Sequence, residues 1–256
     1  MGVLRKNRSH SLWVLPIWCP ACNLPSLVRG DINSREGSFC IWCRSNSRQR
    51  AIASLVRHAE GILRHEGHKA EVIGVSDGYI TEKWAKRKFG RHYKNFHYHK
   101  EPSLDLVTIE AQYFAMANIA ICSEVLEHVE PPVHRAFTGL AAVLATGGFL
   151  VISVPYTTSG TEHVEHFEEL LDGHLDNSPN GFAWTGKNAE GTERRYTELI
   201  FHGGIGSTLE FRVFSEKSLR DNLTSAGFSL VKIMDNHRLS GISWEPWSRV
   251  WLVRKN

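Results

Sequence analysis

Apolar and polar positions in the middle of the chain are arranged in blocks that predict a strand, a helix and a second strand. Residues 117–122 and 149–154 are short apolar runs bounded by polar or Gly/Pro residues, a pattern typical of strands buried on both faces of a parallel sheet. Between them apolar residues recur at helical spacing up to Gly147 and Gly148, where we expect the helix to end. Such a unit predicts a right-handed parallel crossover, with ligands bound beyond the carboxyl ends of its strands. In this chain that end is SEVLEH, residues 123–128.

Other blocks predict the rest of a sheet and its helices. Residues 70–75 predict the first strand, followed by a helix that ends near Phe89, and residues 95–99 predict the next strand. We expect one helix to begin with Ser47 as its N-cap and a later one with Ser215 as its N-cap. Residues 228–234 and 250–253 predict the strands that close the sheet.

Composition narrows the class of protein. The 256 residues are 42% hydrophobic, which is enough to bury a sizeable core, and no apolar run approaches the roughly 18 residues of a membrane span. The first 18 residues lack the long apolar stretch and small-residue cleavage site of an export signal, so we expect a cytoplasmic protein without a membrane partner. A net charge of +3 is too small to imply a nucleic-acid partner by itself.

Four of the five cysteines form two C-x2-C pairs, Cys19 with Cys22 and Cys40 with Cys43. Each pair directs two thiolates at one centre, and two pairs complete a tetrahedral shell, so the spacing predicts a structural Zn²⁺ with no open coordination position. Disulfide bonds are the alternative, which a reducing compartment disfavours. Cys122 lies in an apolar strand, where we expect a small buried hydrophobic residue.

Several motifs in a fixed order carry a resemblance to a known family. The segments ICSEVLEHV (121–129) and VLATGGFLVISVP (143–155) resemble the fourth and fifth strands of class I S-adenosylmethionine-dependent methyltransferases of the type 11-like branch. FSEKSLRDNLTSAGF (214–228) is also similar to that branch. YKNFHYHKEPSLD (93–105), placed after the cysteine pairs, resembles a subgroup with an N-terminal zinc module.

The resemblance implies a fold and a division of the chain. We expect an α/β fold, a Rossmann-like seven-stranded sheet that is parallel with an antiparallel closing strand, preceded by a small four-cysteine zinc module. Residues 1–46 would form the zinc module and residues 47–256 the methyltransferase domain.

The resemblance also implies S-adenosylmethionine as cofactor. GVSDG (74–78) corresponds to the family's glycine-rich loop, with Ser76 in place of the middle glycine. Glu101, after the second strand, is the candidate for the ribose hydroxyls and Asp105 the alternative. The implied cofactor-binding residues are Gly74, Ser76, Asp77, Gly78, Glu101, Asp105, Ser123 and Glu124.

Residues 156–214 form an insertion with little periodicity, too long for an ordinary loop, and we expect a substrate-selecting lid. His202 within it is a candidate general base, although a glycine turn without catalytic function is the competing interpretation. His163 and His166 have a spacing that a second metal site could also use.

The predicted function is methyl transfer to an O, N or C nucleophile of a small metabolite or sugar-like acceptor. One alternative is a nucleic-acid methyltransferase that holds phosphates with the zinc module and with Arg44, Arg48 and Arg50. A solvated first helical turn is the simpler interpretation of these three arginines, and a basic rim for an acidic or phosphorylated substrate is the other. Another is a non-catalytic module that has lost cofactor through the altered glycine loop. An NAD-dependent enzyme would need a G-x-G-x-x-G loop, which residues 74–78 do not provide.

Overall fold

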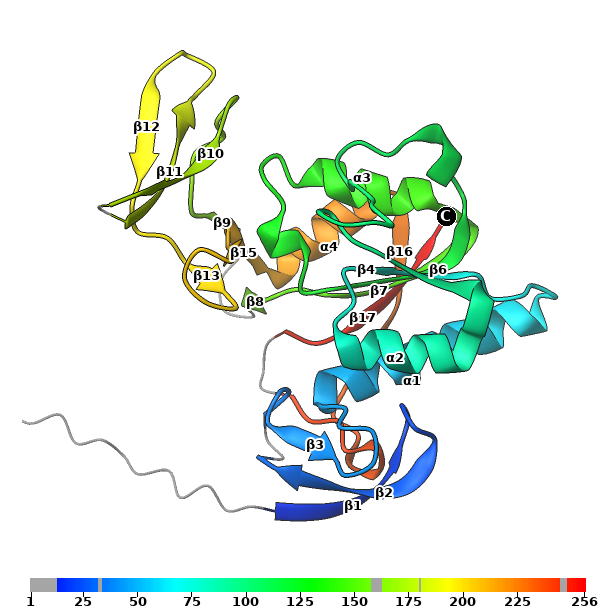
Figure 1. Ribbon diagram of the computed structural model, residues 1–256. Coiled ribbons are helices and arrows are strands. Elements are labelled where there is room, and N and C mark those ends of the chain that lie inside the picture. The colour runs from blue at the N-terminus through cyan, green and yellow to red at the C-terminus, as the bar shows by residue number, and fades with distance from the viewer. Residues whose placement is uncertain (1–12, 32–33, 158–162, 180, 245–247) are drawn as a thin grey trace, which may run out of the picture.

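The computed structural model describes residues 13–31, 34–157, 163–179, 181–244 and 248–256. A central sheet of mostly parallel strands carries helices on both faces (Figure 1). Its strands in spatial order are β16 (Phe228–Ile233), β17 (Trp251–Lys255), β7 (Leu144–Ser153), β6 (Ala117–Ser123), β4 (Val72–Val75) and β5 (Tyr93–Phe96). β17 pairs antiparallel with both of its neighbours, whereas β7, β6, β4 and β5 are parallel to one another. The predicted α/β class with an antiparallel closing strand is therefore confirmed.

The strand count differs from the expectation, because the described part of this sheet has six strands instead of seven. The segment between β5 and β6, residues 97–116, contains only bends, a turn, isolated bridges and the short 3-10 helix η2 (Ala111–Tyr113). It lacks the helix and strand of a further crossover, so β5 is the edge of the sheet. The apolar blocks of the sequence had indicated six strands, and only the family resemblance implied a seventh.

Successive side chains of a strand point to opposite faces of the sheet, and this divides the core into two layers. Ile119 and Ile121 of β6 face α1 (Ser47–His65) and α2 (Tyr79–Phe89), while Ala120 and Cys122 face the opposite helices, α3 (His134–Val143) and α4 (Glu216–Ser225). Cys122 is fully buried, as predicted for a small core residue.

Two helix ends differ from the predictions. Asn46, not Ser47, caps α1, because its side chain accepts from the backbone N–H of Gln49 and Gln49 reaches back to the N–H of Asn46. α3 ends at Val143 and β7 starts at once, so Gly147 and Gly148 lie within the strand instead of ending the helix. Ser215 caps α4 as predicted.

The cysteine-rich segment forms a separate three-stranded antiparallel sheet of β1 (Trp13–Cys19), β2 (Leu24–Gly30) and β3 (Ser38–Cys40). It packs beneath α1 and beside the connection that contains the 3-10 helix η4 (Arg238–Ser240) (Figure 1). We call residues 13–46 of this segment the cysteine module. The boundary at residue 46 stays a prediction.

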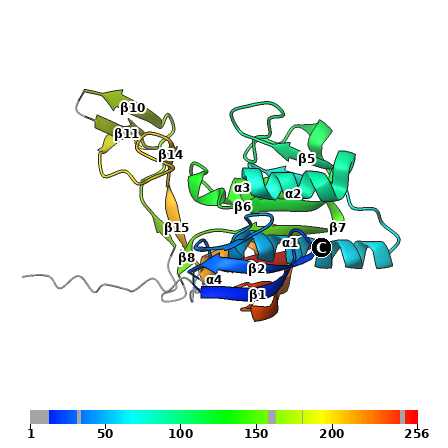
Figure 2. The ribbon, with the colours of Figure 1, turned by 60° about the horizontal axis from the view of Figure 1, so that its bottom comes forward.

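The insertion is not irregular, as its weak periodicity had suggested, but folds into short strands around a small core of its own. That core contains Phe167, Trp184, Leu209 and Phe211. Figures 1 and 2 both show its outer strands beyond one end of the central sheet. The strands are β8 (Tyr156–Thr157), β9 (Val164–Glu165), β10 (His174–Ser178), β11 (Gly181–Lys187), β12 (Glu193–Tyr196), β13 (Phe201–His202), β14 (Thr208–Leu209) and β15 (Arg212–Ser215).

Two 3-10 turns complete the described elements, η1 (Gly90–His92) and η3 (Leu126–His128). None of the helices in the described ranges is long and apolar enough to cross a membrane. Residues 1–12, on which the expectation of no export signal partly rests, lie outside the described part, and cytoplasmic location stays a prediction.

Candidate functional site

The carboxyl ends of the four parallel strands meet in one row. Phe96, Val75, Cys122 and Ile152 are aligned across β5, β4, β6 and β7. The next residue of each strand is His97, Ser76, Ser123 or Ser153, so this edge changes at once from apolar to polar. Because ligands of open α/β sheets bind beyond this edge, the row defines where a cofactor would sit.

The loop after β4 has the backbone shape of the family's glycine loop despite its serine. Ser76 has a φ of 54°, in the left-handed region that glycine adopts most easily, and its N–H donates to the carbonyl of Phe96 at 2.7 Å. Gly78 is the N-cap of α2, and a Cβ placed there would meet nothing within 4 Å. The backbone is thus open at the amino end of α2, where N–H groups favour an electronegative ligand.

Gly74 has a different role. A Cβ at this buried position would lie closer than 3.0 Å to side-chain oxygens of Asp77, Tyr93 and Asn95. The glycine therefore makes room for the protein's own polar groups, and direct contact between Gly74 and a cofactor stays a prediction.

Asp77 lies buried behind the loop. Its carboxylate accepts from the Tyr93 hydroxyl at 2.7 Å, and its backbone N–H and carbonyl both bond to the side chain of Asn95 at 3.0 Å. Burial raises the pKa of Asp77 to about 7, even though the Tyr93 hydroxyl favours the charged form. Asp77 therefore holds the loop in shape and can keep its proton near neutral pH.

We expect the raised pKa of Asp77 to make stability depend on pH. Unfolded Asp77 loses its proton near its ordinary pKa of 3.8, whereas the folded protein keeps it up to about pH 7. The contribution is complete below pH 4 and is lost as the pH rises through 7, with a slope of about 1.4 kcal/mol per pH unit between these limits. Urea denaturation from pH 4 to pH 8 should show this decline in the wild type and a flatter profile in Asp77→Asn. The surface change Asp221→Asn in α4 is the control, and an Asp77→Asn profile as steep as that of the control would contradict the assignment.

The predicted ribose-binding acids lie in a compact loop after β5. Both oxygens of the exposed Glu101 accept from Ser103, one from its N–H at 3.1 Å and one from its hydroxyl at 3.2 Å. Asp105 is half-buried and accepts from the N–H of Val107 at 2.8 Å. Both carboxylates thus support their own loop, and the choice between them as the ribose ligand stays a prediction.

Ser123 and Glu124 belong to a polar network that the cysteine module completes. The Ser123 hydroxyl lies 2.8 Å from that of Ser153, which donates to Glu124 at 2.8 Å. The other oxygen of Glu124 accepts from the guanidinium of Arg35, which also donates to the carbonyl of Ser248 at 2.8 Å. The cysteine module therefore reaches the carboxyl edge itself, and the spacing of motifs gave no sign of this contact.

Arg48 and Arg50 have partners inside the protein, which neither interpretation of the three arginines anticipated. Arg48 donates to Ser123 at 2.7 Å and to Glu36 of the cysteine module. Arg50 is fully buried and donates to the carbonyls of Ser38, Ser45 and Gly241. The two side chains join α1 to the cysteine module, the sheet edge and the η4 connection, and only Arg44 of the three is exposed.

A second polar cluster begins three residues beyond Glu124. Glu127 is fully buried, and burial, followed by repulsion from Glu124, raises its pKa well above the ordinary range. His128 lies beside it, and its Nδ1 is 2.8 Å from the carbonyl of Leu209, while burial lowers the pKa of the ring. His202, the predicted base, packs edge-on against His128 with ring centroids 4.8 Å apart. The fold thus brings His202 to the turn that follows the carboxyl edge.

Sequence reasoning missed Glu210, which joins two of the histidines of the insertion. Its two oxygens lie 2.8 Å from Nε2 of His202 and 2.9 Å from Nε2 of His166. His163 contacts a different carboxylate, that of Glu165, at 2.6 Å. His163 and His166 therefore have separate acidic partners in the described structure, in spite of the spacing that suggested a shared metal. No pattern in the sequence pointed to Glu210, because its two histidine partners lie 44 and 8 positions away along the chain.

Arg212 fastens the insertion to this turn. The fully buried guanidinium donates to Glu165 at 2.7 Å and to the carbonyls of Leu126 and Val129. The N–H of Phe211 also donates to the carbonyl of Glu127 at 2.8 Å. The insertion is thus attached to the turn that follows β6 at the carboxyl edge of the sheet.

The four cysteines of the two C-x2-C pairs converge as predicted. The sulfurs of Cys19 and Cys43 are 3.7 Å apart and those of Cys22 and Cys40 are 3.9 Å apart, too far for a disulfide. Zn–S bonds of about 2.3 Å in a tetrahedron give sulfur–sulfur distances of about 3.8 Å, so the donor set fits Zn²⁺. Hydrogen bonds from Cys19 and Cys43 hold the pKa of Cys40 far below its usual range.

The two turns that carry the cysteines share one backbone design. Asn23 and Arg44 follow the second cysteine of each pair, and both have a left-handed backbone, with φ of 59° and 62°. Their N–H groups donate to the carbonyls of Cys19 and Cys40, at 2.8 and 2.9 Å. The shared geometry places all four sulfurs around one centre.

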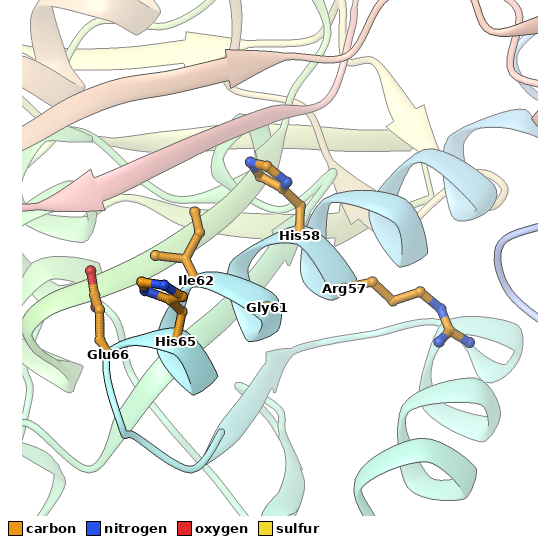
Figure 3. Close-up of a pocket in the computed structure, with 6 residues that line it drawn as sticks. All are labelled: Arg57, His58, Gly61, Ile62, His65 and Glu66. Atoms are coloured by element: carbon orange, nitrogen blue, oxygen red, sulfur yellow. The ribbon is translucent and has the colours of Figure 1, made fainter.

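A hollow on α1 lies away from these groups. It is lined by residues of that helix, among them His58 and Ile62, and by its C-cap Glu66 (Figure 3). Glu66 bonds to Arg254, which also bonds to the carbonyl of Gly147 near the start of β7. The hollow therefore lies toward the amino ends of the strands and is not part of the site.

Comparisons with known proteins identify the family. A family model described as a methyltransferase domain matches residues 31–233. No curated protein matches the chain. Two solved structures illustrate the likeness in fold, both at TM-scores below 0.5. One is a 1,6-didemethyltoxoflavin-N1-methyltransferase of Burkholderia thailandensis with bound 1,6-didemethyltoxoflavin and S-adenosylhomocysteine, at 18% identity and a TM-score of 0.43 over 79% of this chain and 78% of that one.

The other is SAM-bound CalS10, an amino pentose methyltransferase from Micromonospora echinaspora, at 12% identity and a TM-score of 0.46 over 79% of this chain and 90% of that one. Because the family model spans most of the sequence, the chain belongs to the methyltransferase-domain family and is a class I S-adenosylmethionine-dependent methyltransferase.

Proposed function

We propose that the protein transfers the methyl group of S-adenosylmethionine to a small-molecule acceptor bound between the carboxyl edge and the insertion. The observation that carries this is the loop after β4, where left-handed Ser76 and the open Gly78 keep the glycine-loop geometry although one glycine is missing. This supports a chain that retains cofactor binding, in preference to a module that has lost it.

The chain offers groups for each part of the cofactor. The backbone of Ser76 and Gly78 would approach the methionine portion, and Glu101 or Asp105 would accept from the ribose hydroxyls. Ser123 and Glu124 would border the portion nearest the acceptor, with Arg35 and Ser153 fixing the Glu124 carboxylate. The cofactor itself supplies a methyl group already activated by the sulfonium, so the protein acts mainly through proximity and orientation.

The acceptor side is formed by the turn after β6 and by the insertion. His202 has a side chain that is 42% exposed, and its Nε2 contacts Glu210 at 2.8 Å. An imidazole oriented by a carboxylate suits the removal of a proton from an acceptor hydroxyl or amine. The attachment of the insertion by Arg212 supports its assignment as the segment that selects the acceptor.

The four cysteines would hold a structural Zn²⁺. All four coordination positions are taken by thiolates, so the ion would stabilise the cysteine module and would not act on the substrate. The contacts of Arg35 and Arg48 indicate how that stability would extend to the sheet edge.

Calorimetric titration with S-adenosylmethionine and NAD side by side tests this function. We expect the wild type to bind S-adenosylmethionine and not NAD. Gly78→Thr should lower the affinity for S-adenosylmethionine about 10-fold or more, because it adds bulk in the open space while keeping a good N-cap.

The control is Gly61→Ala on α1, where a Cβ also meets nothing within 4 Å, and it should bind as the wild type does. Unchanged affinity in a folded Gly78→Thr variant would remove the loop from the cofactor site. Binding of NAD instead of S-adenosylmethionine would overturn the proposed function.

A further inference from the structure

Glu127 is a buried carboxylate, and among the residues that the structure describes neither of its oxygens has a hydrogen-bond partner. Burying an ionised carboxylate is costly unless a charge or hydrogen bonds compensate it. The nearby Arg212 donates to Glu165, Leu126 and Val129 and makes no hydrogen bond to Glu127. The protein thus places in its interior an acidic group that is attracted by the charges of Arg35, Arg48 and Arg212 but accepts no hydrogen bond within the described structure.

The two histidines beside Glu127 are oriented as metal ligands usually are. The Leu209 carbonyl can only accept, so Nδ1 of His128 donates to it and Nε2 carries a free lone pair 3.8 Å from Oε1 of Glu127. His202 has Glu210 as the partner of its Nε2, which fixes its ring in the same way. Donation from the other ring nitrogen to a carbonyl or carboxylate is the usual support of a metal-binding imidazole.

The separation of the three donors suits one ion. One donor atom each from Glu127, His128 and His202 lies within 4.8 Å of the others. Bonds of about 2.1 Å place the ligands of one ion about 3 to 4 Å apart, so rotations of the half-exposed His202 side chain are enough to close the set.

We propose that Glu127, His128 and His202 bind one divalent transition-metal ion, at a site distinct from the four cysteines. Two imidazoles and one carboxylate leave coordination positions open for water or another oxygen. The ion would complete the compensation of the Glu127 carboxylate and face the space assigned to the acceptor. It would also take the free lone pair of His202, so that with metal bound this imidazole would act as a ligand in place of a general base. An acceptor with a hydroxyl or carboxylate oxygen as a metal ligand is the class this site would take. That last step rests on the proposed function, whereas metal binding does not.

Titration of the zinc-containing protein with Mn²⁺ alone, followed by electron paramagnetic resonance, tests the site. Mn²⁺ prefers oxygen and nitrogen ligands and competes poorly for four thiolates, so it reports on this cluster. We expect one bound Mn²⁺ per chain, an unchanged zinc content in the same samples and a higher melting temperature with Mn²⁺. Glu127→Gln and His202→Ala should each weaken Mn²⁺ binding at least ~10-fold and abolish the thermal shift.

His174→Ala provides the matched control, since it removes an exposed histidine of the same insertion that lies outside the cluster. It should bind Mn²⁺ as the wild type does. Absence of Mn²⁺ binding to the wild type up to millimolar concentration overturns the proposal, as does wild-type affinity in Glu127→Gln. Because the readout is metal and not methyl transfer, failure here leaves the titration with S-adenosylmethionine unaffected.

Discussion

Replacing Cys40 by serine should remove bound zinc and unfold the cysteine module. Purified without added metal, the wild type should carry one zinc per chain by elemental analysis, and Cys40→Ser almost none. Binding of structural zinc by four thiolates is worth on the order of 10 kcal/mol, far more than a three-stranded sheet of this size gains from its own core. The loss should also loosen α1, because buried Arg50 donates to the carbonyls of Ser38 and Ser45 of that module.

Cys122→Ser is the matched control for this experiment. It changes a fully buried cysteine in β6, away from the four-sulfur cluster, and should keep one zinc per chain. A metal-free wild type that is folded and has intact thiols would contradict the zinc assignment.

Replacing Arg212 by methionine should lower the free energy of unfolding by roughly 2–4 kcal/mol, since the fully buried guanidinium serves two carbonyls that would each be left without a donor, at about 1–3 kcal/mol apiece. The carbonyls of Leu126 and Val129 would lose their donor, and Glu165 would keep only His163. Denaturant titration measures the change, and limited proteolysis should show earlier cleavage within residues 163–214 than in the wild type.

Arg194→Met tests whether any lost ion pair has this effect. Arg194 pairs with Glu168 at 2.9 Å, but the side chains are 45% and 42% exposed, and such a pair contributes less than about 1 kcal/mol. Equal losses in the two variants would show that the buried network around Arg212 has no special role.

Elements that are specified by a short stretch of sequence, such as cysteine pairs, apolar strands and helix caps, were predicted correctly in most cases. The C-x2-C pairs specify a four-sulfur cluster by spacing alone, and the apolar runs of β6 and β7 specify buried parallel strands. Ser215 was identified as a cap because the capping pattern is contained in four residues. Asn46 was missed because Ser47 next to it is an equally good candidate, and the choice depends on the bond between Ser47 and Ser243, 196 residues away.

The contacts that complete the site depend on long-range packing, which a single sequence does not reveal. Arg50 looks like a residue of a solvated first turn until the η4 connection brings the carbonyl of Gly241 to it. Arg35 reaches Glu124 across 89 positions of sequence. The strands of the insertion were not predicted, because most of them are two to five residues long. Such strands are too short for an alternation of apolar and polar residues to be recognised.

The insertion leaves and rejoins the sheet at one place. β8 and β15 are parallel neighbours with Tyr156 opposite Phe214, so the ends of a segment of nearly sixty residues are separated by about the 4.8 Å of adjacent strands. A segment with such ends can be exchanged as a unit without altering β4 and the loop that follows it, which we propose binds the cofactor.

A replacement unit would have to reproduce one contact. Residues 209–212 supply the carbonyl, the N–H and the guanidinium that bond to the turn containing Leu126, Glu127 and His128. Chimeras that keep these four residues and vary only the outer strands β10–β12 would change the residues around the proposed acceptor space. They would keep the contact between the insertion and the turn after β6. On the proposed function, this architecture would let the choice of acceptor change while methyl-donor binding is kept.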